Sequence, residues 1–269
     1  MYNDFYGFRE APFNITPDPR FLFFSERHRE AFNHLLFGIH QRKGFIQLTG
    51  EVGAGKTTLS RALLEELDET YRTALILNPV MTGNQLLRSI LRELGFSVGR
   101  IDRVSSMEFL NSFLLEQVHA GNDVVLLIDE AQDMSPDLLE QVRLLSNLET
   151  DQRKLLQIVL IGQPELREKL NARKLRQLRQ RITVRYHLEP LDLDETDQYI
   201  RYRMQVAGAN SRPTFSRWAL RRIHRYSQGI PRLVNAVCDK TLLCGYVTGS
   251  DHLRWKHVRR AIRDLEGAP

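Results

Sequence analysis

The first 190 residues alternate between short apolar runs and stretches whose apolar residues recur at helical spacing. Five of the runs have the composition of buried strands, at residues 45–49, 73–77, 124–129, 155–162 and 182–188. Helical patterns cover residues 26–42, 58–67, 85–94 and 106–119, and another helix opens at Ser135-Pro136. Strands that alternate with helices predict an α/β fold with right-handed crossovers. The last run is the most polar, so we expect it at an edge of the sheet.

From residue 194 onward the strand-like runs give way to helical segments at 194–207, 214–226, 230–246 and 254–266. The N-terminal 25 residues are rich in Phe and Pro, and the three prolines between Ala11 and Phe21 exclude a helix in that stretch. We therefore divide the chain into three parts. Residues 1–25 form an ordered segment packed on the α/β core, residues 26–192 form the α/β domain, and residues 193–269 form a helical domain.

The sequence between the first strand and its helix fits the phosphate-loop pattern G-x-x-x-x-G-K-[ST]. Its residues are Gly50, Glu51, Val52, Gly53, Ala54, Gly55, Lys56 and Thr57. Glycines let the backbone curl so that successive N–H groups point inward, and the helix start adds a positive dipole end. We expect Lys56 to reach the β- and γ-phosphates of a nucleotide and Thr57 to ligate Mg²⁺, and we count Thr58 among the contacts. The competing interpretation is an ordinary Gly-rich turn before a helix.

A pair of acids, Asp129 and Glu130, ends the third strand pattern. A carboxylate at the carboxyl end of a buried strand lies at the ligand edge of an open α/β sheet. We expect Asp129 to hold Mg²⁺ and Glu130 to orient and polarise the attacking water. A solvated strand end is the alternative.

Three further positions are candidates for the same chemistry. Gln163 follows the fourth strand, where its side chain either senses the γ-phosphate or caps the next helix. Asn147 is a weaker candidate for that neighbourhood. Arg232 lies at a helix start, an electrostatically poor place for a structural cation, which indicates contact with nucleotide phosphate.

Arg179 and Arg181 precede the last strand, from which an arginine projects away from its own pocket. Supplied to a neighbouring subunit, such a residue would act as an arginine finger, and we favour Arg181 because it abuts the strand. A solvated basic helix is the alternative, since other basic residues lie nearby.

The composition narrows the remaining choices. The net charge of +5 is only mildly basic, although eight arginines and no acid lie between Gln198 and Cys238. Arg217, Trp218, Arg221, Arg222 and Arg225 form either a nucleic-acid face or a solvated helical face. The cysteines and histidines show no metal-ligand spacing, and no apolar stretch reaches membrane-span length. With no signal-peptide pattern at the start, we expect a cytoplasmic protein.

Together these motifs resemble an AAA+ ATPase, a P-loop NTPase. A narrower resemblance is to the N-terminal ATPase domain of general secretion pathway protein A (the ExeA type) and to MSHA-type pilus biogenesis ATPases. It is carried by the opening from Phe5 to Phe13, by Thr16-Pro17-Asp18-Pro19-Arg20 and by Leu48-Thr49-Gly50-Glu51-Val52-Gly53. Leu144-Leu145-Ser146-Asn147-Leu148-Glu149 and Gly162-Gln163-Pro164-Glu165-Leu166 extend it, so that it covers nearly the whole chain.

The resemblance implies a five-stranded parallel sheet in the order 5-1-4-3-2, followed by a helical lid. It also implies ATP and Mg²⁺ as cofactors, Ile15 near the adenine and Arg232 as the sensor 2 residue. We expect a homo-oligomer that forms on ATP binding and serves a secretion or pilus assembly protein at the cytoplasmic face of the inner membrane. The alternatives are a DNA-binding ATPase of transposition or regulatory type and a nucleotide switch that does not hydrolyse ATP.

Overall fold

The computed structural model describes residues 1–14, 18–97, 99, 102–150, 153–209 and 212–267. The chain folds into two compact units. The first, which we call the helical unit, comprises Met1–His28, Glu51–Thr58 and Glu189–Pro269. The second, the α/β unit, comprises Arg29–Gly50 and Leu59–Leu188.

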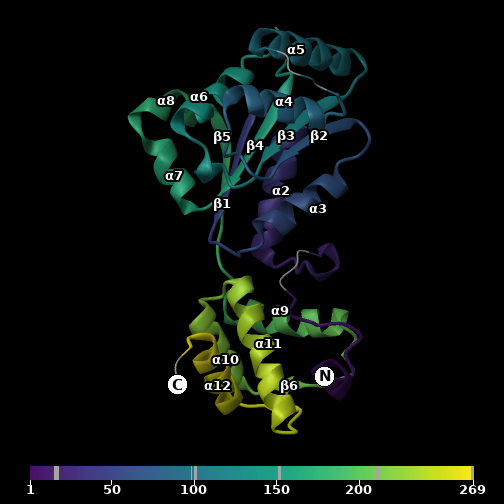
Figure 1. Cartoon of the computed structure of the whole chain (residues 1–269), viewed down its shortest axis with the longest axis vertical. Coiled ribbons are helices and arrows are strands. Elements are labelled where there is room, and N and C mark those ends of the chain that lie inside the picture. The colour runs from purple at the N-terminus through teal and green to yellow at the C-terminus, as the bar shows by residue number, and fades with distance from the viewer. Residues whose placement is uncertain (15–17, 98, 100–101, 151–152, 210–211, 268–269) are drawn as a thin grey trace. The chain divides into compact units, whose positions relative to one another are not determined.

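Five parallel strands form the sheet of the α/β unit (Figure 1). They are β1 (Phe45–Gly50), β2 (Tyr71–Ile76), β3 (Asp123–Ile128), β4 (Leu156–Gly162) and β5 (Ile182–Leu188). Their order is β2-β3-β4-β1-β5, which confirms the predicted topology. Strands β1 and β4 are buried along their whole length, whereas β5 lies at an edge and alternates buried with exposed residues, as its polar sequence predicts.

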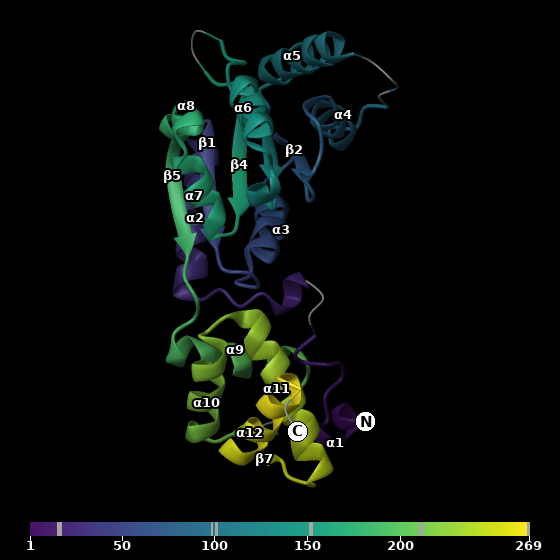
Figure 2. The same ribbon diagram turned by 60° about the vertical axis from the view of Figure 1, so that its left-hand side comes forward.

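Helices cover both faces of this sheet (Figure 2). One apolar core joins the strands to α4 (Gly83–Glu93), α5 (Arg103–His119), α6 (Pro136–Leu145), α7 (Pro164–Asn171) and α8 (Arg176–Arg181). Helix α2 (Glu26–His40) packs against the other face of β1. The approach is close at Gly38, where a Cβ would lie 2.6 Å from the Ile46 side chain. Helix α3 (Lys56–Glu66) follows β1, and short 3₁₀ turns lie at Ala131–Asp133 and Arg173–Leu175. Ser135 caps α6 through its side chain as predicted. Helices α7 and α8 were expected only as alternatives, after Gln163 and around Arg179, and the structure contains both.

The helical unit is built mainly from four helices. They are α9 (Leu193–Val206), α10 (Arg217–Ser227), α11 (Pro231–Val247) and α12 (Trp255–Leu265), preceded in the chain by α1 (Tyr2–Tyr6) and a 3₁₀ turn at Pro19–Phe21. Two strands that the sequence pattern did not predict, β6 (Thr214–Phe215) and β7 (His252–Leu253), pair in parallel. A two-residue strand is too short to show alternation, so periodicity gives no signal for it. Among the described helices, none is long and apolar enough to cross a membrane.

The N-terminal segment packs differently from our expectation. We expected residues 1–25 on the α/β core, but Tyr6, Phe8, Phe13 and Phe21 share the core of α9–α12. The buried Arg203 of α9 gives the physical reason. Its guanidinium donates to the carbonyls of Pro12 at 2.6 Å and Asn14 at 3.0 Å, and it lies over the Phe21 ring. A buried charge needs such partners, and a Pro-rich stretch outside any helix leaves its carbonyls available.

The turn before α11 generates a stability prediction. Gly229 has φ +74°, and a Cβ there would lie 1.8 Å from the Leu191 carbonyl oxygen. Gly249 is a matched control, because it has φ +62° but no atom within 4 Å of the position that a Cβ would take. Gly249→Ala should lower the free energy of unfolding of the helical unit by about 1 kcal/mol, the cost of the left-handed backbone. Gly229→Ala should cost about 3 kcal/mol, because overpacking is added. Thermal unfolding that gave equal losses would contradict this account.

Candidate functional site

The loop between β1 and α3 adopts a backbone that only glycine supports at two positions. Gly53 has φ +81° and Gly55 has φ +102°. A Cβ at Gly53 would lie 2.4 Å from the Cβ of Arg232. Glycine is therefore required here both for the backbone angle and for a close approach of the chain.

Lys56 is the first residue of α3, and its side chain folds back on the loop that precedes it. The ammonium donates to the carbonyl oxygen of Glu51 at 2.9 Å, and the Ala54 N–H donates to the same oxygen at 3.1 Å. The lysine is buried, so its positive charge is held against the loop rather than in bulk solvent. A cation and a helix start on one short loop form a binding place for phosphate.

His28 supports this loop, although the sequence pattern did not single it out. It is buried in α2, where its Nδ1 lies 2.9 Å from Ser25 Oγ and its Nε2 lies 3.0 Å from the Ala54 carbonyl oxygen. The C=O and N–H of a trans peptide point in opposite directions, so a bond to the Ala54 carbonyl aims the Gly55 N–H away from His28. Burial lowers the pKa of the imidazole. A neutral ring with its proton on Nε2 satisfies both contacts, since Nδ1 then accepts from the serine hydroxyl.

The first turn of α11 contacts the same loop. Pro231 opens this helix, and the backbone N–H of Arg232 donates to the Gly53 carbonyl at 3.2 Å. The Arg232 side chain is exposed. The structure thus brings the predicted sensor arginine to the loop through its own main chain, within the helical unit.

The acidic pair lies at the carboxyl end of β3 in the α/β unit. Asp129 is buried, and its backbone N–H extends the ladder by donating to the Ile76 carbonyl at 2.8 Å. Its carboxylate accepts from the Glu130 N–H at 2.9 Å. Glu130 has φ +51° and ψ 36°, a left-handed conformation that is uncommon for a residue with a side chain and is often found at functional sites.

Two glutamine amides hold the Glu130 carboxylate. Its Oε2 accepts from Gln132 Nε2 at 2.6 Å and from Gln163 Nε2 at 3.2 Å. Gln132 also accepts from the Gln163 N–H through its Oε1, at 3.0 Å, so the three side chains form one network. Gln163 occupies the N-cap position of α7 but makes no side-chain capping bond. The geometry therefore favours a role beside Glu130 over the capping alternative. Gln132 was missed because nothing in its local pattern separates it from a surface residue.

Arg181 and Asn147 lie near the amino-terminal ends of the parallel strands, whereas Asp129 follows the carboxyl-terminal end of β3. Arg181 ends α8 directly before β5, and its guanidinium donates to the Arg143 carbonyl in the last turn of α6 and to the hydroxyl of Ser146, the C-cap of that helix. The strands are parallel, so this amino edge is remote from the carboxyl end of β3. We expected Asn147 near Gln163, and this expectation is wrong. Asn147 lies in the connection between α6 and β4, which leads to the amino-terminal end of β4, whereas Gln163 follows the carboxyl-terminal end of that strand. Arg179 instead donates to Asn171, at 3.1 Å.

The remaining predicted positions concern adenine and metal. Ile15 lies outside the described residues. Among the described residues, no group of three or more His, Cys, Asp and Glu side chains is arranged to hold a metal ion. Thr57 and Asp129 nevertheless supply a hydroxyl and a carboxylate, the oxygen donors that Mg²⁺ takes when it keeps most of its water and also binds substrate phosphates. Each of these donor types, taken by itself, fits the chemistry of that ion.

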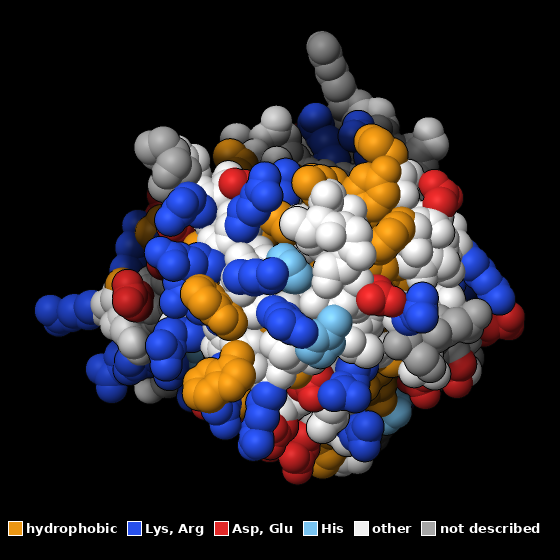
Figure 3. Space-filling view, turned by 90° about the horizontal axis from the view of Figure 1, so that it is seen from below, with side chains coloured by type: hydrophobic (Ala, Val, Ile, Leu, Met, Phe, Trp, Pro, Cys, Tyr) orange, Lys and Arg blue, Asp and Glu red, His pale blue; other side chains and the backbone are white. Residues whose placement is uncertain are grey.

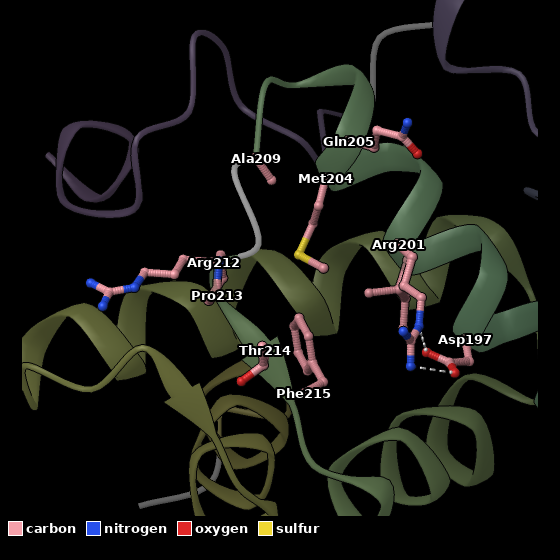
Figure 4. Close-up of a pocket in the computed structure, with 10 residues that line it drawn as sticks. Asp197, Arg201, Met204, Gln205, Ala209, Arg212, Pro213, Thr214 and Phe215 are labelled. Carbon is pink, nitrogen blue, oxygen red and sulfur yellow. Dashed lines mark hydrogen bonds and ion pairs between the residues drawn. The ribbon is translucent and has the colours of Figure 1, made fainter.

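A pocket of about 310 Å³ opens in the helical unit beside α9, and none of the predicted site residues lines it (Figure 4). Met204 and Phe215 give it an apolar floor. Its arginines already have carboxylate partners, Arg201 with Asp197 at 2.8 Å and Arg212 with Asp251 at 3.2 Å. This pocket therefore does not have the free cations of a phosphate site.

The buried His28 makes the loop sensitive to acid. Its pKa is lowered in the folded protein, so below about pH 6.5 the unfolded chain binds a proton that the folded chain does not. The free energy of unfolding should therefore fall as the pH drops from about 6.5 toward the lowered value. His28→Ala should remove this part of the pH dependence, and His34→Ala, at an exposed histidine, should retain it. Denaturant unfolding at several pH values measures the effect, and identical profiles for the two variants would refute it.

Known proteins that contain an AAA domain are similar to this chain in sequence. Residues 39–170 match a family model described as an AAA domain. The chain is 46% identical over 268 residues to general secretion pathway protein A of Aeromonas hydrophila, a match that covers 99% of this chain and 49% of that protein. The chain thus spans about half the length of that relative. A weaker match, 27% over 94 residues, is to the ATP-dependent DNA helicase dda of Enterobacteria phage T4, covering 35% of this chain and 21% of that protein.

Solved structures share the fold at low sequence identity. The ORC2 protein of Aeropyrum pernix superposes with a TM-score of 0.69 at 17% identity, covering 97% of this chain and 73% of that one. Cdc6p of Pyrobaculum aerophilum gives 0.71 at 18% identity, with 94% and 70% covered. With its phosphate-loop sequence, its acidic strand end and this sheet order, the chain has the fold of AAA+ P-loop proteins and is similar to general secretion pathway protein A.

Proposed function

We propose that this chain binds ATP and hydrolyses it with the help of Mg²⁺. The observation that carries the proposal is the loop from Gly50 to Thr57, with its two left-handed glycines, its buried lysine and the α11 start bonded to Gly53. Such a loop offers main-chain N–H groups, a helix dipole and an ammonium to a triphosphate. We assign Lys56 to the β- and γ-phosphates, and Val52, Ala54 and Thr58 to the surrounding contacts.

We assign the Mg²⁺ ligands to Thr57 and Asp129. When bound, the ion neutralises developing charge on the phosphate oxygens. Glu130 is the group that would accept a proton from water or orient it. Gln132 and Gln163 are amides, so they hold the carboxylate of Glu130 in place without neutralising its charge. In this scheme Gln132 is a positioning residue, and Gln163 and Arg232 respond to the γ-phosphate.

The biological role follows from the relative. We propose that ATP use by this chain energises or regulates assembly of a secretion or pilus system in the bacterial envelope. A homo-oligomer formed on ATP binding, acting with an inner-membrane assembly protein at the cytoplasmic face of the membrane, is the setting that this role requires. In this proposal residues 26–192 act as the nucleotide-binding domain, residues 193–269 act as the lid, and Ile15 contacts adenine. A DNA-binding role is less favoured, since the match to the DNA helicase covers only 35% of this chain, whereas the match to the secretion protein covers 99%.

Substitutions in the two halves of the machinery should separate binding from turnover. Lys56→Ala should weaken ATP binding by at least about tenfold, since a hydrogen bond to a charged group is lost. Glu130→Gln should still bind ATP but hydrolyse it about 100-fold or more slowly, because general-base catalysis is lost. Calorimetry and a phosphate-release assay measure the two quantities, with the exposed Lys43→Ala as control. Equal ATP binding by wild type and Lys56→Ala would refute the assignment.

The position of Arg181 at the amino edge of the sheet suits action on a neighbouring subunit. Hydrolysis per subunit should then rise with protein concentration. Arg181→Ala should abolish the rise and lower turnover by about 1,000-fold, the usual worth of an arginine finger. Arg179→Ala, whose side chain donates to Asn171, is the matched control. A flat dependence of turnover on concentration, in a chain that remains monomeric, would remove Arg181 from the mechanism.

A further inference from the structure

The helical unit contains two copies of one small motif, a short strand followed by a helix. Strands β6 and β7 pair in register, Thr214 with His252 and Phe215 with Leu253. Helices α10 and α12 begin two residues after them and pack against each other. Carrying the register forward aligns the arginines of one helix with arginines at the equivalent positions of the other. The equivalent pairs are Arg221 with Arg259, Arg222 with Arg260 and Arg225 with Arg263.

The outer sides of these helices carry a concentrated positive charge. We name this surface the Arg–Trp face, and its members are Arg217, Trp218, Arg221, Arg222, Arg225, Trp255, Lys256, Arg259, Arg260 and Arg263, all of them exposed. Figure 3, a view from below Figure 1, shows Lys and Arg side chains gathered on the left with hydrophobic groups among them. Helix α10 contains no acid, and α12 contains only Asp264.

This arrangement is unfavourable for a purely structural surface. Like charges recur four residues apart, as in Arg217–Arg221 and Arg259–Arg263, and such pairs destabilise a helix. Within the described part of the chain, no ion pair involves any of the eight cations of the face, although several arginines elsewhere have carboxylate partners. An anionic partner would relieve this repulsion.

The two tryptophans narrow the chemistry of that partner. Trp218 is 68% exposed and Trp255 is 52% exposed, values that are high for so large an aromatic side chain. The Arg221 guanidinium lies over the Trp218 ring, 5.1 Å from its centroid. One face of that ring is therefore covered by a cation of its own helix, so a nucleic-acid base could stack only on the other face. Indole side chains beside cations suit the headgroup layer of a bilayer, where an amphipathic ring needs no free face.

We propose that the Arg–Trp face docks the helical unit on a bilayer rich in anionic phospholipid. The arginines would contact lipid phosphates, and the tryptophans would enter the headgroup layer. The proposal extends the proposed role at the envelope, but it concerns a surface that shares no residue with the nucleotide site. An ATPase fixed to the membrane surface in this way would meet membrane-embedded partners by diffusion in two dimensions.

Vesicle co-sedimentation of the whole chain without nucleotide tests the proposal. Phosphatidylcholine vesicles containing phosphatidylglycerol should retain the chain, and pure phosphatidylcholine vesicles should not. Replacing Arg221, Arg222, Arg259 and Arg260 by Gln should weaken retention by at least about tenfold. The matched control replaces four exposed arginines of the α/β unit, Arg72, Arg92, Arg167 and Arg173, and should weaken it by no more than about twofold. Trp218→Ala with Trp255→Ala should also reduce retention at high salt, where charge is screened.

Several outcomes would overturn the inference. Equal losses for both quadruple variants would mean that net charge alone drives binding. Retention that the Gln substitutions leave unchanged would remove the face from the interaction. Tighter binding to single- or double-stranded DNA than to anionic vesicles, lost in the same Gln variant, would assign the face to nucleic acid instead. ATP binding by all the variants, measured by calorimetry, keeps the result separate from the proposed ATPase function, since loss of lipid binding with intact ATP binding rejects only the docking surface.

Discussion

Hydrogen bonds to two backbone carbonyl oxygens, those of Gly53 and Ala54, fix the conformation of the phosphate loop, and nucleotide binding depends on that conformation. The Gly53 carbonyl accepts from the Arg232 N–H, and the Ala54 carbonyl lies within hydrogen-bond distance of His28 Nε2. A peptide plane whose oxygen is fixed also has a fixed N–H direction. The loop is thus shaped by its own glycines and also by α2 and α11, which come from distant parts of the sequence. Loss of either partner would leave the glycines free to take other conformations, since glycine has little intrinsic preference.

The acidic end of β3 is organised by a different kind of partner. Glu130 is in a left-handed conformation and accepts from two neutral amides, Gln132 and Gln163. A lysine or arginine at these positions would stabilise the carboxylate as an ion pair and weaken it as a base. Amide donors orient the group and leave its negative charge in place. The same network joins the ends of β3 and β4, so a shift of either strand end would move the carboxylate.

Arginines along the chain differ in whether they have an acidic partner. In the α/β unit, arginines such as Arg42 and Arg143 have acidic partners. In the helical unit, the cations of the Arg–Trp face repeat on two helices that follow paired strands, and they lack such partners within the described chain. A net charge of +5 conceals this contrast, because acids elsewhere balance the count. The local arrangement of charge, rather than its sum, indicates an anionic partner.

The sequence alone determined the five strands of the parallel sheet, their order through a family resemblance, most helices, and the residues of the phosphate loop and the acidic pair. These follow from local patterns: apolar runs, glycine spacing, and an acid at a strand end. Only the tertiary structure revealed the contact of His28 with the phosphate loop, the bond from Gln132 to Glu130 and the packing of the N-terminal aromatics on α9–α12. Only the structure showed that Asn147 lies near the amino-terminal ends of the strands. The physical reason is that these roles depend on hydrogen bonds and burial between segments far apart in the chain, for which no residue carries a local signal.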